Sequence, residues 1–476
     1  MSSQTRPRSR TELPDGLARG RSTRRPSRPS SLVRDPGPAR LRSRAAVELL
    51  FGPVAGRDFA VRYWDAHLET PSGGSPPAYT LVLTSPAALR RMFLPPSELR
   101  LAEAFIAGDF DVEGDLEAAT GLAEHLRQRL AAPGLWPRLV ATLAALPHGQ
   151  AHARTTAGPA AAHLHGSRHS LHRDAAAVRS HYDVGNEFYR LWLDRELVYS
   201  CGYFRTGGED IHTAQRDKME HICRKLRLRP GERLLDIGCG WGGLIRHAAR
   251  HFGADAMGIT LSAEQARFAR ERIASEGLAE RCRVEVRDYR EMPDDAQFDK
   301  VVSVGMVEHV GVEQLPRYFA TAVRLTRPGG LFLNHGITGR LVTPERGLLP
   351  RITQRIWDAG SFMQHCVFPD GEMPPLDRIV TAARHAGFEV RDVETLRDHY
   401  ARTLRRWRER LEQAAVSARA LVGEATFRTW RLYMAGCARA FAVGEIDVAQ
   451  TVLGRRDGQG RVAIPLTRAD LYAGLA

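Results

Sequence analysis

The sequence lacks any long uninterrupted run of apolar residues. The stretch 139–146 is typical of its apolar segments, whereas a helix that crosses a bilayer needs about 18–20 consecutive apolar residues. This shortage argues against a membrane-spanning protein, so any contact with a membrane is expected to be peripheral. Twin arginines at 24 and 25 are followed by Pro- and Ser-rich sequence in place of an apolar signal region, so export is not expected either.

Cysteine is scarce and scattered. The six cysteines form no CxxC pair and none of the spacings that build a zinc site, so neither a metal centre nor a disulfide framework is expected. Four histidines lie between residues 148 and 165, but no cysteine partners or regular frame accompany them, and we assign them to a linker. Unpaired cysteines favour a reducing cytoplasm as the location of the protein.

Positive charge is concentrated in the first 44 residues. They hold twelve arginines against three acidic residues, a net charge of +9 out of +13 for the whole chain. Such a Pro-, Ser- and Arg-rich segment cannot bury enough apolar surface to fold alone, which predicts a disordered tail over 1–44. The tail could contact nucleic acid or an anionic bilayer, or have no specific partner.

The rest of the sequence divides into two folded regions. Strand-like alternation in 58–93, followed by helical spacing, predicts a small α+β domain over 45–146. Residues 147–170 are rich in Ala, Gly, His and Pro without periodicity, which is typical of a linker. Over 171–476, short apolar runs alternate with helical stretches, and this pattern predicts a parallel sheet covered by helices on both faces.

One of the apolar runs ends in a glycine loop, LLDIGCGWGGL at 234–244. Glycines at 238 and 240 let the backbone approach a nucleotide-like ligand, and the following helix offers free N–H groups. Dinucleotide-binding loops of this kind are followed by a ribose-binding acid at the end of the next strand. That strand here ends in GITLSAEQ, without an acid at Thr260 or beside it, which argues against a nicotinamide cofactor. Trp241 within the loop could serve packing alone.

A cysteine surrounded by aromatic residues marks the segment HYDVGNEFYRLWLDRELVYSCGYF, residues 181–204. Together with other segments in the same order, it resembles the cyclopropane-fatty-acyl-phospholipid synthases and their relatives, the cyclopropane mycolic acid synthases and fatty-acyl methyltransferases. The matching segments are HYDVGNEFYRLWL, YSCGYF, LLDIGCGWGGL, GITLSAEQ, DYR, SVGMVEHVG, FLNHGI, VFPDGEMP, HYARTLRRW and FRTWRLYMAGCARAF. FIAGDFDVEGDL, at 105–116, looks like the N-terminal domain of the bacterial phospholipid enzymes.

The resemblance implies both a fold and a reaction. The fold is an α/β class I methyltransferase, with a Rossmann-like doubly wound sheet and a smaller N-terminal α+β domain. In the reaction, the cis double bond of a phospholipid acyl chain attacks the methyl group of S-adenosylmethionine and becomes a carbocation. Loss of a proton from the new methyl group then closes a cyclopropane ring. Aromatic rings stabilise a cation in a dry pocket, which accounts for the many rings around the cysteine.

The resemblance also implies the residues of the site. Bicarbonate serves as the base, held by Cys201, Glu308, His335, Tyr400 and a backbone group at Ile337. The cofactor is bound at its amino-acid end by Tyr199 and Ser200, from beneath by Asp236, Gly238 and Gly240, at the ribose by Gln265, and near the adenine by Asp288 and Tyr289. His309 and Cys239 match no family role and are taken as structural.

Three functions stay open at this stage. The first is a cyclopropane synthase that contacts phospholipids at the inner face of the membrane, with 134–146 as the docking segment. The arginines of 399–413 could assist docking or form a solvated charged face. The second is an acyl methyltransferase that gives methylene- or methyl-branched chains. The third is a nucleic-acid-binding protein that uses the basic tail, although no nucleic-acid partner is expected for the enzyme. The oligomeric state is open and includes a homodimer.

Overall fold

The structure is a computed structural model that describes residues 37–72, 76–130, 134–148, 168–171, 173–174, 184–339, 362–368 and 370–473. The predicted tail as far as residue 36, most of the predicted linker and the tripeptide at 181–183 lie outside the described residues. Three of the four histidines between 148 and 165 are therefore not described. From Pro38 onward the chain forms one compact unit. The division at the linker therefore stays a prediction.

The N-terminal region contains the mixture of helices and strands that the sequence predicted. Its sheet has the strand order β2-β1-β3-β4, with β1 and β3 parallel and the two outer pairs antiparallel. The elements are α1 (Pro38–Phe51), η1 (Val54–Gly56), β1 (Ala60–Arg62), β2 (Leu68–Glu69), β3 (Tyr79–Leu83), α2 (Ala88–Phe93), α3 (Glu98–Ile106), β4 (Phe110–Gly114), α4 (Leu116–Thr120), α5 (Leu122–Leu130) and α6 (Leu135–Ala144).

Helix α1 corrects the predicted boundary of the tail. It begins at Pro38, whereas we predicted disorder through residue 44. The helix forms because its second half buries Ala46, Val47 and Leu50 in the N-terminal core. Its first half is also held: Arg40 pairs with Asp65 at 2.6 Å, and Arg42 donates to the carbonyl oxygen of Ala145 at 3.0 Å. A helix rich in arginine on one side still folds when its other side is covered.

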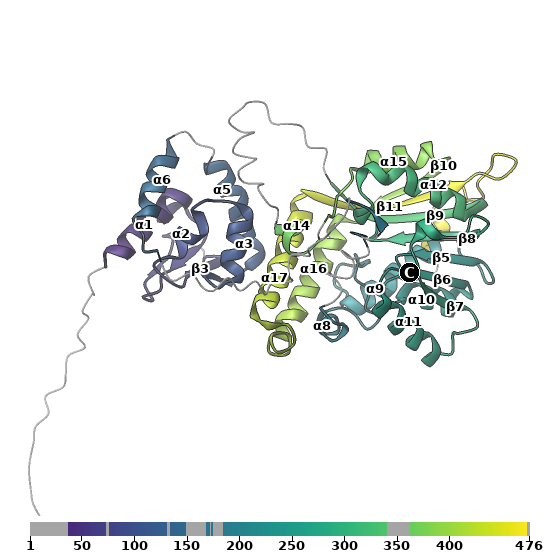
Figure 1. Cartoon of the computed structure of the whole chain (residues 1–476), viewed down its shortest axis with the longest axis horizontal. Helices are drawn as coiled ribbons and strands as arrows, with labels where there is room; N and C mark the ends of the chain where they lie inside the picture. Colours follow the sequence, from purple (N-terminus) through teal and green to yellow (C-terminus); the bar gives the residue numbers. More distant parts are fainter. Residues whose placement is uncertain are drawn as a thin grey trace, which may run out of the picture. The chain divides into compact units, whose positions relative to one another are not determined.

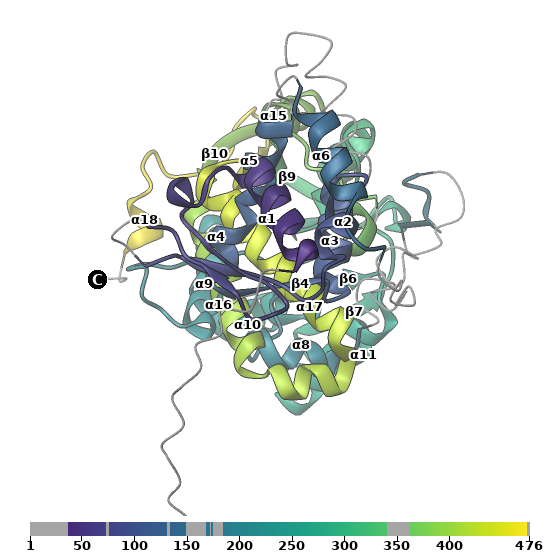
Figure 2. The same cartoon turned by 90° about the vertical axis from the view of Figure 1, so that its left-hand side faces the viewer.

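Helix α6 carries the segment that we expected to dock on a bilayer. Leu139 and Leu143 are 0% exposed and lie in the same core as α1. The two helices pack side by side in both views (Figures 1 and 2). The apolar face of α6 is therefore used inside the protein, and only a smaller part, including Val140, faces outward. Across the described ranges, we find no helix that has both the length and the apolar character to cross a membrane.

The second region is built on a seven-stranded sheet with the order β10-β11-β9-β8-β5-β6-β7. Its elements are α8 (Asn186–Trp192), α9 (Ile211–Lys225), β5 (Arg233–Ile237), α10 (Gly243–Phe252), β6 (Asp255–Thr260), α11 (Ala263–Ser275), β7 (Cys282–Val286), η2 (Tyr289–Glu291), β8 (Phe298–Val304), η3 (Val307–His309), η4 (Val312–Gln314), α12 (Leu315–Leu325), β9 (Thr326–Gly339), α14 (Phe362–Cys366), α15 (Leu376–His385), β10 (Phe388–Thr395), α16 (Arg397–Gln413), α17 (Ala415–Val443), β11 (Ile446–Arg455) and α18 (Ala469–Tyr472).

The sheet confirms the doubly wound fold and corrects one detail of it. The five strands from β5 to β9 are parallel, as predicted, but β11 runs antiparallel to both of its neighbours, β9 and β10. We did not predict β10 or β11. Strand β10 hides its pattern because it lies at the sheet edge and carries many charged residues, as edge strands often do.

Both faces of the sheet are buried by helices. Helices α10 and α11 lie on one side, and α12 and α15 on the other (Figure 1). Neighbouring residues of one strand enter different cores: Leu234 packs with α10, whereas Leu235 packs with α12. This alternation follows from the period of two in a strand, and it explains why the strands read as nearly continuous apolar runs.

Helices α16 and α17 connect the sheet region to the N-terminal region. Arg405 of α16 forms an ion pair with Glu117 of α4, with 2.6 Å between nitrogen and oxygen. Arg428 of α17 is 6% exposed and donates to the carbonyl oxygens of Phe105 and Phe110. Arg410 donates to carbonyl oxygens near the end of α8. Several arginines that we considered for lipid contact or a solvated face are thus held by internal partners.

We predict that Gly258→Ala destabilises the fold. Gly258 lies in β6, where an added Cβ would stand 2.6 Å from Sγ of Cys239 in the glycine loop and 3.0 Å from Cδ1 of Ile245. Overpacking of this kind costs about 1–3 kcal/mol, which thermal and urea unfolding would detect. Gly56→Ala is the matched control, because its added Cβ has open space. Equal stability of the two variants would contradict the packing that the structure describes.

Candidate active site

A pocket opens at the carboxyl ends of the central parallel strands. It has a volume of about 160 Å³, and its walls come from the loops that follow β5, β6, β7 and β8. The chain reverses its direction of winding between β5 and β8, which are neighbours in the sheet. Loops that leave such a switch point diverge to opposite faces, so this is where a doubly wound sheet has room for a ligand.

The glycine loop forms the floor of this pocket. Gly238 has φ +83°, and a Cβ there would approach Cγ of Met306 to 3.2 Å. Gly240 has φ +53°, with open space where its Cβ would stand. The loop leads into α10, whose first residues Gly243 and Leu244 also line the pocket. A left-handed backbone and bare glycines thus leave space for a ligand close to the N–H groups of a helix start.

Asp236 stands at the end of β5 with an unusual environment. It is 3% exposed, and its Oδ1 atom has no hydrogen-bond partner among the described residues. Burial raises the pKa of this carboxyl to about 7, and the nearby Lys218 ammonium opposes the rise. A buried acceptor without a partner is costly, and a ligand that donates a hydrogen bond would relieve that cost.

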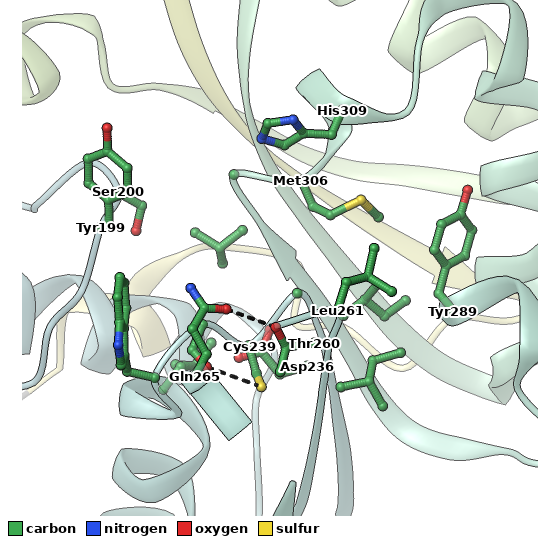
Figure 3. Close-up of a pocket in the computed structure, with 18 of the residues that line it drawn as sticks. Tyr199, Ser200, Asp236, Cys239, Thr260, Leu261, Gln265, Tyr289, Met306 and His309 are labelled. Atoms are coloured by element: carbon green, nitrogen blue, oxygen red, sulfur yellow. Dashed lines mark hydrogen bonds between the residues drawn. The ribbon is translucent and has the colours of Figure 1, made fainter. Parts of the chain in front are cut away.

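Tyr199 and Ser200 lie on one side of the pocket, opposite Tyr289 (Figure 3). Helix α9 holds Ser200 in two ways: Gln215 donates to its carbonyl oxygen at 2.7 Å, and Nζ of Lys218 donates to its Oγ at 2.8 Å. The tyrosine hydroxyl of Tyr199 donates to that of Tyr433 at 3.1 Å. The residues that we predicted for the amino-acid end and for the adenine end therefore lie on opposite walls of one pocket, and the orientation of the cofactor stays a prediction.

Gln265 and Asp288 also line the pocket, but they differ in how many of their polar atoms are already bonded within the protein. Gln265 is 4% exposed, and its Oε1 accepts a hydrogen bond from Thr260 at 2.8 Å. The carboxylate of Asp288 accepts hydrogen bonds from the backbone and guanidinium of Arg290, at 2.7–2.9 Å. Asp288 is thus committed to Arg290 and shapes the wall, and its direct role toward a cofactor stays a prediction.

A second and wider cavity meets the first. Its volume is about 640 Å³, and it shares Tyr199, Gly305 and His309 with the smaller pocket. Most of its wall is apolar and comes from two distant parts of the sequence, the N-terminal helices α3, α4 and α5 and the C-terminal helix α17. An apolar cavity of this kind fits a long apolar chain whose end reaches the shared residues.

Glu308 stands where the two cavities meet, in the wall of the larger one. Its Oε1 accepts a hydrogen bond from the backbone nitrogen of Ile337 at 2.7 Å, and its buried Oε2 has no partner in the described part of the chain. Burial raises the pKa of Glu308 to about 7, although the Ile337 contact favours the ionised form. The carboxyl is therefore able to exchange a proton near neutral pH.

His335 and Cys201 are buried behind the cavity walls. Nδ1 of His335 lies 3.1 Å from the Gln450 amide nitrogen, which donates to it, so the neutral ring carries its proton on Nε2. That Nε2 has no partner among the described residues, and burial lowers the pKa of His335 well below its usual value. The Cys201 thiol is 0% exposed and contacts the carbonyl oxygens of Gly202 and Leu396 at 3.3 and 3.7 Å.

Tyr400 lies within electrostatic range of both Cys201 and Glu308. It lines the wider cavity and stacks on Phe441 with 4.6 Å between ring centroids. Burial raises the pKa of Tyr400 well above its usual value, and Tyr433, Cys201 and Glu308 add to the rise. The structure thus brings Glu308, Ile337 and Tyr400 to one cavity wall, whereas Cys201 and His335 are not among the wall residues of either cavity in the described ranges.

Sequence reasoning missed several residues of the pockets, among them Cys239, which we took as structural and which lines the smaller pocket (Figure 3). His309, which we took as structural, lines both cavities, and burial lowers its pKa to about 4. Trp241 lines the smaller pocket and donates through Nε1 to the Asn186 side chain at 2.8 Å. Lys218 lies in the middle of a helix of mixed composition, so no local pattern singled it out. Only the packing of α9 against the pocket reveals it.

We predict that Glu308→Gln changes how stability depends on pH. The folded-state pKa of about 7 lies above the ordinary value of 4.5, so the folded protein binds an extra proton between these values. Glu308 therefore stabilises the fold relative to the glutamine variant most below pH 4.5, and this advantage is lost as pH rises to about 7. Urea unfolding of both proteins across pH 4–8 would measure it; a difference that is constant with pH would contradict the burial. The contributions of the other carboxyl groups cancel in the difference between the two proteins, since both proteins carry them.

The sequence is similar to that of known methyltransferases. The sequence profile of the family described as "Mycolic acid cyclopropane synthetase" matches residues 169–451. The chain is 41% identical over 402 residues to a "Probable fatty acid methyltransferase" of Pseudomonas putida, covering 84% of this chain and 93% of that protein. It is 35% identical over 277 residues to "Cyclopropane mycolic acid synthase 1" of Mycobacterium tuberculosis, covering 58% of this chain and 95% of that protein.

A solved structure shows the same fold. The mycolic acid cyclopropane synthase CmaA1, crystallised in complex with SAH and CTAB, superimposes with a TM-score of 0.54 at 34% sequence identity. The match covers 59% of this chain and 98% of CmaA1. The chain therefore belongs to the mycolic acid cyclopropane synthetase family of S-adenosylmethionine-dependent methyltransferases and has their class I methyltransferase fold.

Proposed function

We propose that this enzyme transfers the methyl carbon of S-adenosylmethionine to the cis double bond of a phospholipid acyl chain and closes a cyclopropane ring. The observation that carries this proposal is the wide apolar cavity, which meets the cofactor pocket at Tyr199, Gly305 and His309. An acyl chain in that cavity can reach the cofactor without crossing water. A hydrophilic substrate would find few hydrogen-bond partners in a wall that is mostly apolar.

The polar groups and the open space of the smaller pocket fit S-adenosylmethionine. The Asp236 Oδ1 atom is a buried acceptor without a partner, and the bare glycine at 240 leaves open space above the loop. When bound, the cofactor supplies an activated methyl group on a positively charged sulfur. The chain's residues hold and orient it: Tyr199 and Ser200 at one end of the pocket, Tyr289 at the other.

Two aromatic rings line the wider cavity near its meeting point with the cofactor pocket: Tyr199, which lines both cavities, and Tyr433, which contacts it through their hydroxyls. Trp192, Trp407 and Trp430 pack around Tyr199 behind the wall, with 5.3–6.1 Å between ring centroids. Ring faces attract a cation most strongly where water is excluded. We infer that Tyr199 and Tyr433, held in place by these tryptophans, stabilise the carbocation that forms on the acyl chain after methyl transfer.

Two of the groups that the resemblance assigns to bicarbonate carry buried polar atoms that are open to a ligand. Glu308 can be protonated near neutral pH, and its Oε2 and the Nε2 of His335 are buried without partners in the described residues. We infer that both groups, with Tyr400, hold bicarbonate, which supplies a proton acceptor when bound. The chain's part is to keep Glu308 and His335 uncharged and shielded from water, so that the acceptor meets the carbocation and not a solvent proton.

The sequence relatives favour a second product. The chain matches two proteins named "Probable fatty acid methyltransferase" over 84% and 87% of its length, from Pseudomonas putida and Mycobacterium tuberculosis. In this alternative a hydride shifts from the methylated carbon to the neighbouring cationic carbon, and the new methyl group then loses a proton. This gives a methylene branch, which a separate reductase with a hydride donor such as a reduced nicotinamide could convert to a methyl branch. Both products need the same cofactor pocket and the same apolar cavity.

A phospholipid substrate implies contact with a bilayer. We propose that the enzyme acts at the inner face of the membrane as a peripheral protein, since its acyl substrate resides there. Because α6 and α16 use their apolar faces inside the protein, the surface that docks on the bilayer is not yet assigned. The basic tail, of which residues 1–36 lie outside the described residues, has the strongest charge complementarity to an anionic bilayer.

Product analysis decides between the two reactions. Purified enzyme would be incubated with methyl-labelled S-adenosylmethionine and vesicles of cis-monounsaturated phospholipid, and the recovered acyl chains examined by mass spectrometry and proton NMR. We expect cyclopropyl protons at high field. Vinylidene or branched-methyl signals would replace ring closure with the second reaction, and absence of label from lipid would overturn the phospholipid substrate.

We further predict that Cys201→Ser lowers kcat by about tenfold to a hundredfold, because proton abstraction by a positioned base contributes about 10²–10⁴ to such reactions. Affinity for S-adenosylhomocysteine should stay unchanged, since Cys201 is not in the wall of the cofactor pocket. Cys223→Ser is the matched control: this thiol is also 0% exposed but packs in the core beside α10, away from both cavities. Equal kcat values for the two variants would remove Cys201 from the base site.

A further inference from the structure

Lys218 is a buried cation at the wall of the cofactor pocket. It lies in the middle of α9, is 2% exposed, and is among the residues that line the pocket. Its Nζ donates one hydrogen bond, to Oγ of Ser200 at 2.8 Å. An ammonium group has three donors, and a buried charge is costly unless it is paired. Among the described residues, no carboxylate lies within the 4 Å of an ion pair with Lys218.

The described acidic residues near Lys218 do not form an ion pair with its ammonium group. Asp194 is within electrostatic range, but its two oxygens accept hydrogen bonds from the backbone nitrogens of Val198 and Glu196, at 2.7 and 2.9 Å. Asp236 is also in range, and its Oδ1 lacks a partner. Burial lowers the pKa of Lys218 to about 8, and Asp194, Cys201 and Asp236 oppose this shift.

A buried cation and a buried carboxyl group thus face one end of the pocket from two different elements. Lys218 comes from α9, and Asp236 comes from the end of β5. Ser200, which Lys218 holds, lies in the wall where the amino-acid end of the cofactor is expected. That end of S-adenosylmethionine is a zwitterion, with a carboxylate and an ammonium on one carbon. A buried cation beside a buried carboxyl matches both of its charges.

We propose that Lys218 binds the carboxylate of the amino-acid end of S-adenosylmethionine, with Asp236 as the acceptor for its ammonium group. Lys218 then has two functions on one helix face: it fixes Ser200 and it pairs with the cofactor. The inference rests on the cofactor assignment and extends it to a residue outside the glycine loop. It predicts that the pocket distinguishes ligands by their amino-acid end.

Calorimetric titration with three ligands tests the proposal. S-Adenosylhomocysteine carries the whole amino-acid end, its decarboxylated analogue lacks only the carboxylate, and 5′-methylthioadenosine lacks the end altogether. We expect Lys218→Met to weaken S-adenosylhomocysteine binding by about tenfold to a hundredfold, the range for a lost charge-assisted hydrogen bond. Binding of the other two ligands should change by less than about twofold, because neither presents a carboxylate to the missing ammonium.

Lys225→Met is the matched control. Lys225 lies on the same helix, is 1% exposed, and pairs with Glu394 at 2.5 Å away from the cofactor pocket. We expect this variant to lose thermal stability and to keep the affinity for all three ligands. Equal weakening of all three ligands by Lys218→Met would instead reduce Lys218 to a support for Ser200 and overturn the proposal.

The wild-type protein provides an arm that does not depend on the folding of a variant. It should bind the decarboxylated analogue about tenfold or more weakly than S-adenosylhomocysteine. Equal affinities would overturn the role of Lys218, since no carboxylate contact would then exist. Failure of wild type to bind any of the three ligands would instead contradict the cofactor assignment, so the two failures are distinguishable.

Discussion

The burial of the seven-stranded sheet on both faces is the constraint on which the rest of the structure depends. Because helices cover both sides, the strands are apolar along their length, and side chains such as Leu234 and Leu235 enter different cores. A polar ligand therefore has access only at the ends of the strands. The change of winding direction between β5 and β8 opens that end, and the glycine loop keeps it free of side chains.

Exclusion of water determines the protonation states in and around the two cavities. Burial raises the pKa of the acids Asp236 and Glu308 to about 7, and it lowers the pKa of the bases His335 and His309. Both effects favour the uncharged form, so the protein presents few fixed charges to a reacting cation. Burial also lowers the pKa of Lys218, but only to about 8, so this pocket residue keeps its charge at neutral pH.

The apolar cavity depends on two parts of the chain that are far apart in sequence. Its wall combines α3, α4 and α5 with α17, and these elements are joined by Arg428, which donates to the carbonyl oxygens of Phe105 and Phe110. The family profile ends at residue 451 and begins at 169, so it does not include the N-terminal half of that wall. The relatives that match over 84% and 87% of the chain extend into the N-terminal region, which forms part of the wall of the wider cavity as well as a core of its own.

The sequence by itself determined the parts of this protein that depend on local pattern. Alternating apolar runs predicted the parallel strands, the loop at 234–244 predicted a nucleotide-like ligand, and the ordered motifs identified the family. Contiguous patterns of this kind are readable because strand burial and glycine turns impose local rules. Even so, the first half of α1 was placed in the tail and the antiparallel β11 was missed, since the partners that stabilise them are distant in sequence. Only the tertiary structure decided that α6 turns its apolar face inward, that Asp288 is committed to Arg290, and that Lys218 and His309 face the pockets. Each of these depends on which surfaces meet after folding, and contact between distant segments leaves no period in the sequence.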